Sequence, residues 1–168
     1  MAKKHYSKEE LYGIYSYMMS RLPQFNFILT YGSLLGCIRE GDFIEGDDDI
    51  DVFLPFKDRE KYIFAIKRLQ LPIIIEDVGF VQINVQHIGP FDVYFYEDRG
   101  SYLYTRWDNI SMTKADILPP KKVSFKGFMI HIPRNSEKFL ADCYGDNWRI
   151  PIAKEDYTWE SITKLKHS

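Results

Sequence analysis

Apolar positions recur at helical spacing near the start of the chain. Ser7 and Glu10 have the spacing of a capping box, in which the serine caps a helix and the glutamate reaches back. The apolar positions that follow are three or four residues apart and end before Pro23: Leu11, Ile14, Tyr15, Met18 and Leu22. This spacing predicts an amphipathic opening helix whose apolar stripe packs into the core.

Short apolar runs and further helical patterns alternate along the rest of the chain. Aromatic and β-branched residues predict strands over 25–31, 49–54, 73–75, 80–85, 91–96, 123–125 and 128–132. Helical spacing predicts helices over 34–40, 58–70 and from Asn135 or Ser136 to Tyr144. Turns are expected at Gly32-Ser33, at 98–101 and at Lys126-Gly127.

The mixture of strands and helices determines the expected fold class. The chain has 168 residues, of which 45% are hydrophobic and 27% are charged, and this composition is typical of one globular domain. No internal repeat and no linker divides it. We therefore expect an α+β (mixed α/β) fold that forms a single domain over residues 1–168.

Charge balance and cysteine content narrow the class of protein. Lysine and arginine number 22 against 24 aspartate and glutamate, so the formal net charge is −2. Proteins that bind duplex phosphates usually have a basic excess, so we expect no stable nucleic-acid binding. The two cysteines, Cys37 and Cys143, cannot build a disulfide framework and are interpreted as reduced, buried thiols.

No segment has the composition of a signal peptide or a membrane span. Residues 1–10 contain no apolar core. The longest uncharged apolar stretch, 27–38, is far shorter than the ~20 residues that a membrane helix needs. We expect a soluble, cytoplasmic protein without a transmembrane segment, peripheral to a membrane at most.

An acidic run is the most informative stretch of the sequence. Six carboxylates fall within ten positions: Asp42, Glu45, Asp47, Asp48, Asp49 and Asp51. Such a cluster is either a solvated acidic loop or is neutralised by a partner. Asp49 and Asp51 alternate with Ile50 and Val52, so on a strand the two carboxylates share one face. Carboxylates fixed side by side favour a hard cation, Mg²⁺ or Mn²⁺.

Residues before and after the acidic run suggest what that cation binds. Gly32 and Ser33, between a strand and a helix, permit close backbone approach and offer amides and a hydroxyl to a phosphate. Asp92 alternates with Phe91 and Val93, so it is the third carboxylate that we expect at the site, unless it faces water at a sheet edge. Together these positions predict a metal–phosphate ligand, that is, a nucleotide.

Several other residues are weaker candidates. Arg39 is a candidate partner of a diphosphate or a surface residue, and Lys121 and Lys122 are candidates for donor phosphates or a charged acceptor, although a solvated pair is the favoured interpretation. Tryptophans 107, 148 and 159 could each stack on a base or sugar, but packing in the core or at its rim is favoured. The four histidines have no metal-ligand spacing, so we assign no zinc.

Several of these stretches resemble one known family. They are YGSLLGCIR (31–39), GDFI (41–44), DDDIDV (47–52), FKG (125–127), IP (132–133) and FLADCYGDNW (139–148). Together they are similar to the LicD family, which belongs to the same broad group as fukutin. The resemblance extends from about residue 25 to residue 151. One departure is Glu45-Gly46, where family members often have Pro-Trp.

The resemblance implies a nucleotidyltransferase-like mixed sheet flanked by helices. It also implies transfer of a phospho-alcohol group, phosphocholine or a polyol phosphate, from a nucleotide donor such as a CDP-alcohol to a glycan or polyol acceptor. The metal-binding acids of the family correspond to Asp49 and Asp51, and its later strand acid corresponds to Asp92. Asp47 is a further ligand or a group that supports the ligands.

In the mechanism that we hypothesise, the acceptor hydroxyl displaces the nucleotide in line at phosphorus, with metal ions at Asp49, Asp51 and Asp92. Asp92 is either a ligand or the base. Two alternatives stay open at this point. A minimal nucleotidyltransferase would use the same acids to transfer a nucleoside monophosphate to a small molecule, protein or RNA, and an inactive module would bind nucleotide without turnover.

Overall fold

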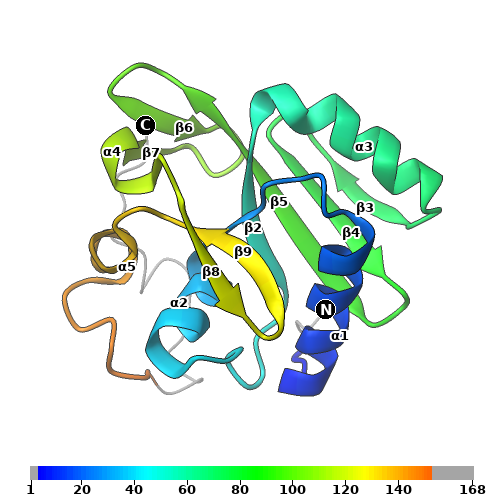
Figure 1. The fold of residues 1–168 in the computed structure, drawn as a ribbon, viewed down its shortest axis with the longest axis horizontal. Helices are drawn as coiled ribbons and strands as arrows, with labels where there is room; N and C mark the ends of the chain where they lie inside the picture. The colour runs from blue at the N-terminus through cyan, green and yellow to red at the C-terminus, as the bar shows by residue number, and fades with distance from the viewer. Residues whose placement is uncertain (1–3, 153–168) are drawn as a thin grey trace.

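A mixed β-sheet forms the centre of the structure, a computed structural model that describes residues 4–152 (Figure 1). Its main strands follow the order β3-β4-β5-β2-β1-β9-β8, and β6 and β7 extend β5 as a further hairpin. The strands are β1 (Ile28–Leu29), β2 (Ile50–Pro55), β3 (Ile73–Glu76), β4 (Phe80–Val85), β5 (Gly89–Asp98), β6 (Tyr102–Thr105), β7 (Ile110–Thr113), β8 (Lys121–Phe125) and β9 (Phe128–Ile132).

Strand direction makes the sheet mixed. The central pair, β2 and β5, is parallel, and so is the pair β1 and β9. The hairpins β3–β4, β4–β5, β5–β6, β6–β7 and β8–β9 are antiparallel. The predicted mixed α/β class is therefore confirmed, and the turns predicted at 98–101 and at Lys126-Gly127 are the β5–β6 and β8–β9 connections.

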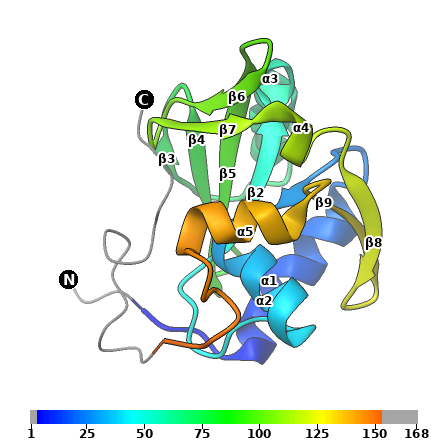
Figure 2. The same ribbon diagram turned by 90° about the vertical axis from the view of Figure 1, so that its left-hand side faces the viewer.

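Helices cover both faces of the sheet (Figures 1 and 2). They are α1 (Lys8–Arg21), α2 (Tyr31–Glu40), α3 (Arg59–Arg68), α4 (Lys114–Ile117) and α5 (Ser136–Tyr144), with a 3₁₀ turn, η1 (Phe56–Asp58), before α3. Helices α1 and α3 lie on one face of the central strands, and α2 and α5 lie on the other. None of the helices in the described part of the chain is long and apolar enough to cross a bilayer.

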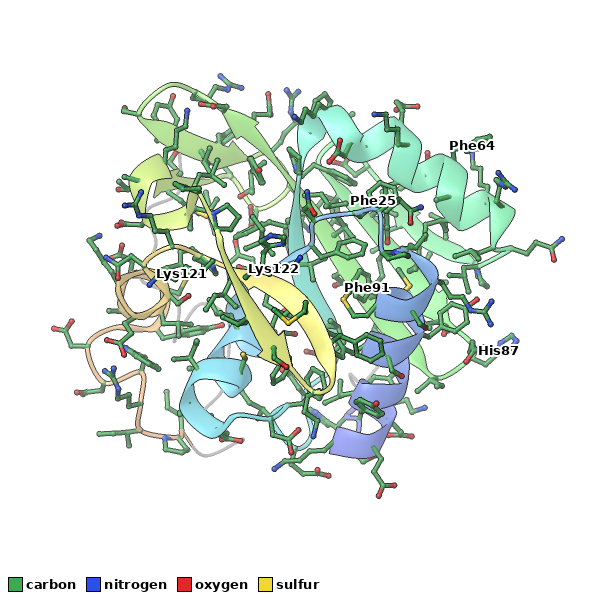
Figure 3. All side chains as sticks on the ribbon, viewed as in Figure 1. Phe25, Phe64, His87, Phe91, Lys121 and Lys122 are labelled. Atoms are coloured by element: carbon green, nitrogen blue, oxygen red, sulfur yellow. The ribbon has the colours of Figure 1, made fainter. Side chains whose placement is uncertain are left out.

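Alternation along β2 and β5 divides the core between these two faces. Phe91 and Phe95 of β5 pack on the side of α1 and α3, where Phe95 meets Tyr62 at 6.1 Å between ring centroids (Figure 3). Phe53 of β2 packs on the other side against Phe139 of α5, at 6.1 Å. The acidic residues of β2 and β5 share the face of Phe53, because positions two apart on a strand point the same way.

Helix α1 forms as its sequence predicts. The Ser7 hydroxyl accepts from the Glu10 N–H at 3.1 Å, and the Glu10 carboxylate accepts from the Ser7 N–H at 2.9 Å. The predicted apolar stripe is buried, including Ile14 and Met18 at 0% exposure. The helix ends at Arg21, before Pro23, as expected.

The segment before the acidic run differs from its prediction. The strand expected over 25–31 is reduced to β1, because Thr30 already serves as the N-cap of α2 and its N–H donates to the Asp51 carbonyl. The chain turns at Tyr31, with φ of 46°, and not at Gly32-Ser33, which lie in the first turn of the helix. Strand β2 begins one residue later than predicted, so Asp49 immediately precedes it.

The segment after β5 contains elements that the sequence did not predict. These are β6, β7 and α4, each of only four residues. Four residues cover only two strand repeats or about one helical turn, so an alternation such as that of β7 is weak evidence for a strand on its own. Strand β6 exists because it pairs with the end of β5, and β7 then pairs with β6.

Replacing Ser7, the N-cap of α1, tests whether the predicted capping box stabilises the fold. In Ser7→Ala the Glu10 N–H loses its acceptor, so we expect the free energy of unfolding to fall by about 1 kcal/mol. Ser20→Ala, a matched change at an exposed serine near the end of the same helix, should change it by less than about 0.5 kcal/mol. Urea denaturation of both variants makes the measurement, and equal effects would contradict the capping role.

Candidate active site

Three carboxylates converge at the start of the central parallel strands. Asp51 of β2 is the direct neighbour of Asp92 in the register between β2 and β5. Asp49 lies just before β2, and one carboxylate oxygen from each of the three lies within 4.8 Å of the others. Asp51 and Asp92 are 7% and 4% exposed, so two acids are almost removed from water at this point of the sheet.

Neighbouring residues hold two of these carboxylates in place. The Gln82 side-chain amide, on β4, donates to both oxygens of Asp92, at 3.0 and 3.2 Å. The Asp51 backbone N–H donates to the Ser33 hydroxyl at 2.9 Å, which ties α2 to β2. The Oδ1 atom of Asp51 is buried and has no hydrogen-bond partner among the residues that the structure describes. A buried carboxylate oxygen of this kind is costly unless a cation or a proton binds to it.

The electrostatics of the cluster follow from burial and from repulsion. Burial raises the pKa of Asp51 well above its ordinary value, and the nearby charges of Asp49 and Asp92 raise it further. Burial also raises the pKa of Asp47 to about 8, with contributions from Asp49 and Asp48. Both shifts mean that, without a cation, the folded protein holds protons that an unfolded chain would release.

A second acidic group shares one residue with the first. Oxygens of Asp47, Asp48 and Asp49 also lie within 4.8 Å of one another. The Asp47 carboxylate accepts from the Asp48 N–H at 3.0 Å and packs against Gly32, where an added Cβ would lie 2.8 Å from its Oδ2 atom. Gly32 is therefore required because the acidic loop comes so close to the first turn of α2.

The first turn of α2 lies directly beside the carboxylates and lacks a side-chain cap. Thr30 is the N-cap, but its side chain makes no capping hydrogen bond. Its hydroxyl oxygen is buried without a partner among the described residues. The amino end of an uncapped helix binds anions through its N–H groups and its dipole. A phosphate at Gly32 and Ser33 would thus lie next to the acidic cluster.

Three cations that the sequence offered as phosphate ligands, Arg39, Lys121 and Lys122, do not border the carboxylates in the structure. Arg39 lies about 9 Å further along α2 than Ser33, by helix geometry. It donates there to the Trp148 carbonyl at 3.4 Å and pairs with Glu40 at 3.1 Å. Lys121 and Lys122 are exposed on β8, which β1 and β9 separate from β2 (Figure 3). The assignment of these three cations to a ligand stays a prediction.

Sequence reasoning missed three residues that border the carboxylates. Gln82 binds Asp92, and its alternation with Val81 and Ile83 on a predicted strand was the signal that placed it on the polar face. Tyr94 follows Asp92 on the same face of β5. Asp108 accepts from the Tyr31 hydroxyl at 2.7 Å across 77 residues of sequence, a contact that no local pattern indicates.

The donor set fits a hard divalent cation. All groups at the convergence are carboxylate oxygens, which Mg²⁺ and Mn²⁺ prefer, and no described histidine or cysteine belongs to either acidic group. The unpartnered Oδ1 of Asp51 supplies an oxygen that is not already used in hydrogen bonding. The residues present therefore fit the metal that the acidic run predicts.

The raised pKa values predict how the stability of the metal-free protein depends on pH. A group whose folded pKa lies above its unfolded pKa stabilises the fold at low pH, and this contribution is lost as the pH rises through the folded value. For Asp47 that window runs from about 4 to about 8. The melting temperature in EDTA should therefore fall between pH 5 and pH 8.5, as measured by circular dichroism.

One variant connects this pH dependence to the cluster. Asp51→Asn removes a charge from the buried group, so its melting temperature in EDTA should fall less between the same two pH values. Asp142→Asn, at an exposed acid of α5, should follow the wild-type curve. A wild-type melting temperature that does not change, or that rises, over this range would contradict the electrostatic description of the cluster.

The fold is similar to those of solved antibiotic-modifying enzymes. The lincomycin-bound crystal structure of the lincosamide antibiotic adenylyltransferase LnuA has a TM-score of 0.54 and 13% identity, over 77% of this chain and 81% of that chain. The solution structure of the antibiotic-resistance factor ANT(2'')-Ia has a TM-score of 0.55 and 13% identity, over 92% and 78%. At these identities the likeness establishes the nucleotidyltransferase-like fold. No curated protein sequence matches the chain significantly.

A family model also matches the sequence. The model, described as LicD/FKTN/FKRP, nucleotidyltransferase domain, matches residues 24–135, which is more than half of the chain. The matched span includes the first turn of α2 and the converging carboxylates of Asp49, Asp51 and Asp92. It therefore contains the whole of the acidic site that the geometry defines. The chain belongs to the LicD/FKTN/FKRP family of nucleotidyltransferase domains.

Proposed function

We propose that this chain is a divalent-metal-dependent transferase. It moves a phospho-alcohol group, phosphocholine or a polyol phosphate, from a nucleotide-diphosphate donor to a hydroxyl group of a glycan or polyol. The observation that carries the proposal is the convergence of Asp49, Asp51 and Asp92 within 4.8 Å beside the amino end of α2. Membership of the LicD/FKTN/FKRP family supports a transferase of the nucleotidyltransferase fold, and the phospho-alcohol is the group that the resemblance of the sequence motifs implies.

The first turn of α2 receives the phosphates of the donor. The N–H groups of this turn point outward along the helix axis, where they can donate to an anion, while the side-chain position of Gly32 is filled by the Asp47 carboxylate. The Ser33 oxygen accepts from the Asp51 N–H, so its own hydroxyl proton can be donated to a phosphate oxygen. In the proposed complex the phosphorus lies next to the carboxylates.

The carboxylates complete the site. Asp49, Asp51 and Asp92 would hold Mg²⁺ or Mn²⁺, which neutralises charge on the phosphoryl oxygens and lowers the pKa of an acceptor hydroxyl. Asp47 lies next to this group and supports it through Asp48 and Asp49. Gln82 donates to both oxygens of Asp92, so it orients the carboxylate that accepts the proton of the attacking hydroxyl in the proposed reaction.

A second reaction would use the same residues. The similar structures include the adenylyltransferase LnuA and a complex of ANT(2'')-Ia with adenylyl-2''-tobramycin, so in those proteins a nucleoside monophosphate is transferred. The two reactions differ in the phosphorus that the acceptor attacks. It is the phosphorus that carries the alcohol in one reaction and the phosphorus that carries the nucleoside in the other. The mass gained by the acceptor distinguishes them, because it is that of either the small phospho-alcohol or the nucleotide.

A thermal-shift screen tests whether the site binds a metal nucleotide. Cytidine, uridine, adenosine and guanosine diphosphates are compared with and without Mn²⁺. At a concentration 100-fold above Kd, a ligand stabilises the fold by about 2.7 kcal/mol, which is several degrees for a domain of this size. We expect such a shift for at least one base, and only with metal. The absence of a metal-dependent shift for any nucleotide would contradict the proposal.

Removal of a single carboxylate tests the active site. Asp51→Asn should lower turnover by more than about 100-fold, since even groups that only orient metal ligands contribute about 10–100-fold. Its circular dichroism spectrum should match that of the wild type. Asp142→Asn serves as the matched control and should keep full turnover. Product formation is measured by the mass of the acceptor, and an Asp51→Asn enzyme with wild-type turnover would exclude the assigned role.

A further inference from the structure

The side chain of Trp107 is partly exposed to solvent and packs against one other ring. It lies in the connection between β6 and β7, and 44% of its surface is open to solvent. Its indole ring stacks on the ring of Phe80, with centroids 4.7 Å apart and planes inclined by 11°. One face of the indole is therefore covered by a buried phenylalanine. A large apolar side chain that keeps this much exposed surface is available to a ligand.

A continuous row of rings connects Trp107 to the carboxylates. In the register between β4 and β5, Gln82 is opposite Asp92 and Phe80 is opposite Tyr94, so all four side chains share one face of the sheet. The rings of Phe80 and Tyr94 lie 5.0 Å apart. Tyr94 is two residues beyond Asp92, or about 7 Å along the strand. Trp107 therefore lies at the outer end of a row of rings, Tyr94, Phe80 and Trp107, that begins two residues from Asp92.

The loop that carries Trp107 is held in place from both sides. Asp108 accepts from the hydroxyl groups of Tyr31 and Thr105, and Tyr31 is the first residue of α2. On the other side, an added Cβ at Gly79 would lie 3.0 Å from the Trp107 backbone nitrogen. The turn before β4 therefore packs closely against the loop, and the indole is ordered before any ligand arrives.

We propose that the exposed face of Trp107 stacks on the base of the nucleotide whose phosphates bind beside Asp51 and Asp92. This inference rests on the proposed function. A nucleotide has its charged phosphates at one end and a planar ring at the other, and the site offers carboxylates and a helix end at one place and a flat aromatic surface beyond them. Because the loop is already ordered, stacking requires little further loss of conformational freedom.

The orientation of Trp107 is suited to stacking on a planar ligand. Tyr31 and Tyr94 meet with planes inclined by 73°, the edge-on contact that is common in a core. Trp107 lies almost parallel to Phe80 instead, so its free face is parallel to the supporting ring and presents a flat surface. Every base has a π-face, and for that reason such a platform binds bases without selecting one by hydrogen bonds.

The test compares a ligand that has a base with one that lacks it. Calorimetry in Mn²⁺ gives the affinities of cytidine, uridine, adenosine and guanosine diphosphates and of inorganic pyrophosphate for the wild type, Trp107→Ala and Trp107→Phe. The matched control is Phe64→Ala, at an aromatic residue of α3 that is 64% exposed on the opposite side of the sheet (Figure 3). Affinity for pyrophosphate reports the phosphate end of the site and the integrity of the fold.

The expected result distinguishes binding of the base from binding of the phosphates. Trp107→Ala should weaken the tightest nucleoside diphosphate by at least about fivefold, as alanine substitution at stacked bases does elsewhere. Its affinity for pyrophosphate should be unchanged, and Trp107→Phe and Phe64→Ala should bind the nucleotide almost as the wild type does. Unchanged nucleotide affinity in Trp107→Ala overturns the inference, as does a wild type that binds pyrophosphate as tightly as every nucleotide. A wild type that binds neither class of ligand refutes the proposed function itself.

Discussion

Repulsion between buried carboxylates is the constraint on which this structure depends. Asp51 and Asp92 are neighbours on two parallel strands, both almost removed from water, and Asp49 lies within reach of both. Parallel pairing in this register keeps the backbones of Asp51 and Asp92 side by side. An arrangement that destabilises the fold unless a proton or a cation binds is expected where binding that cation is the function.

The surrounding elements are arranged to maintain this cluster and to place a ligand beside it. Ser33 ties the first turn of α2 to the backbone of Asp51, and Gly32 leaves room for the Asp47 carboxylate. Gln82 orients Asp92 from the adjacent strand. The amino end of α2 and the carboxylates therefore offer opposite charges within one small region, which suits a phosphate bound together with its metal. This is the chemical basis of the transferase that we propose.

Local patterns in the sequence predicted most of the fold and the centre of the site. The capping box at Ser7, the alternation around Asp51 and Asp92 and the hairpin at Lys126-Gly127 depend on neighbours within a few residues, and all three are present in the structure. The true start of α2 at Tyr31 was not predicted, because it depends on an unusual backbone conformation and on a hydrogen bond to the distant Asp51.

The parts of the site that come from distant segments could not be predicted in this way. Asp108 binds Tyr31 only because β6 and β7 extend β5, and that pairing joins segments that are far apart in the sequence. Sequence reasoning also favoured packing for Trp107, and the structure adds that its ring is half packed on Phe80 and half open. Exposure of a side chain is set by tertiary contacts, which the local sequence does not contain.

The central claim is that Asp49, Asp51 and Asp92 bind a divalent cation. Anomalous diffraction tests it most directly. Crystals grown with Mn²⁺ and measured at the manganese absorption edge should give an anomalous peak between the side chains of Asp51 and Asp92, within bonding distance of Asp49. A map without a peak at this position, or with manganese bound only elsewhere on the molecule, would contradict the account.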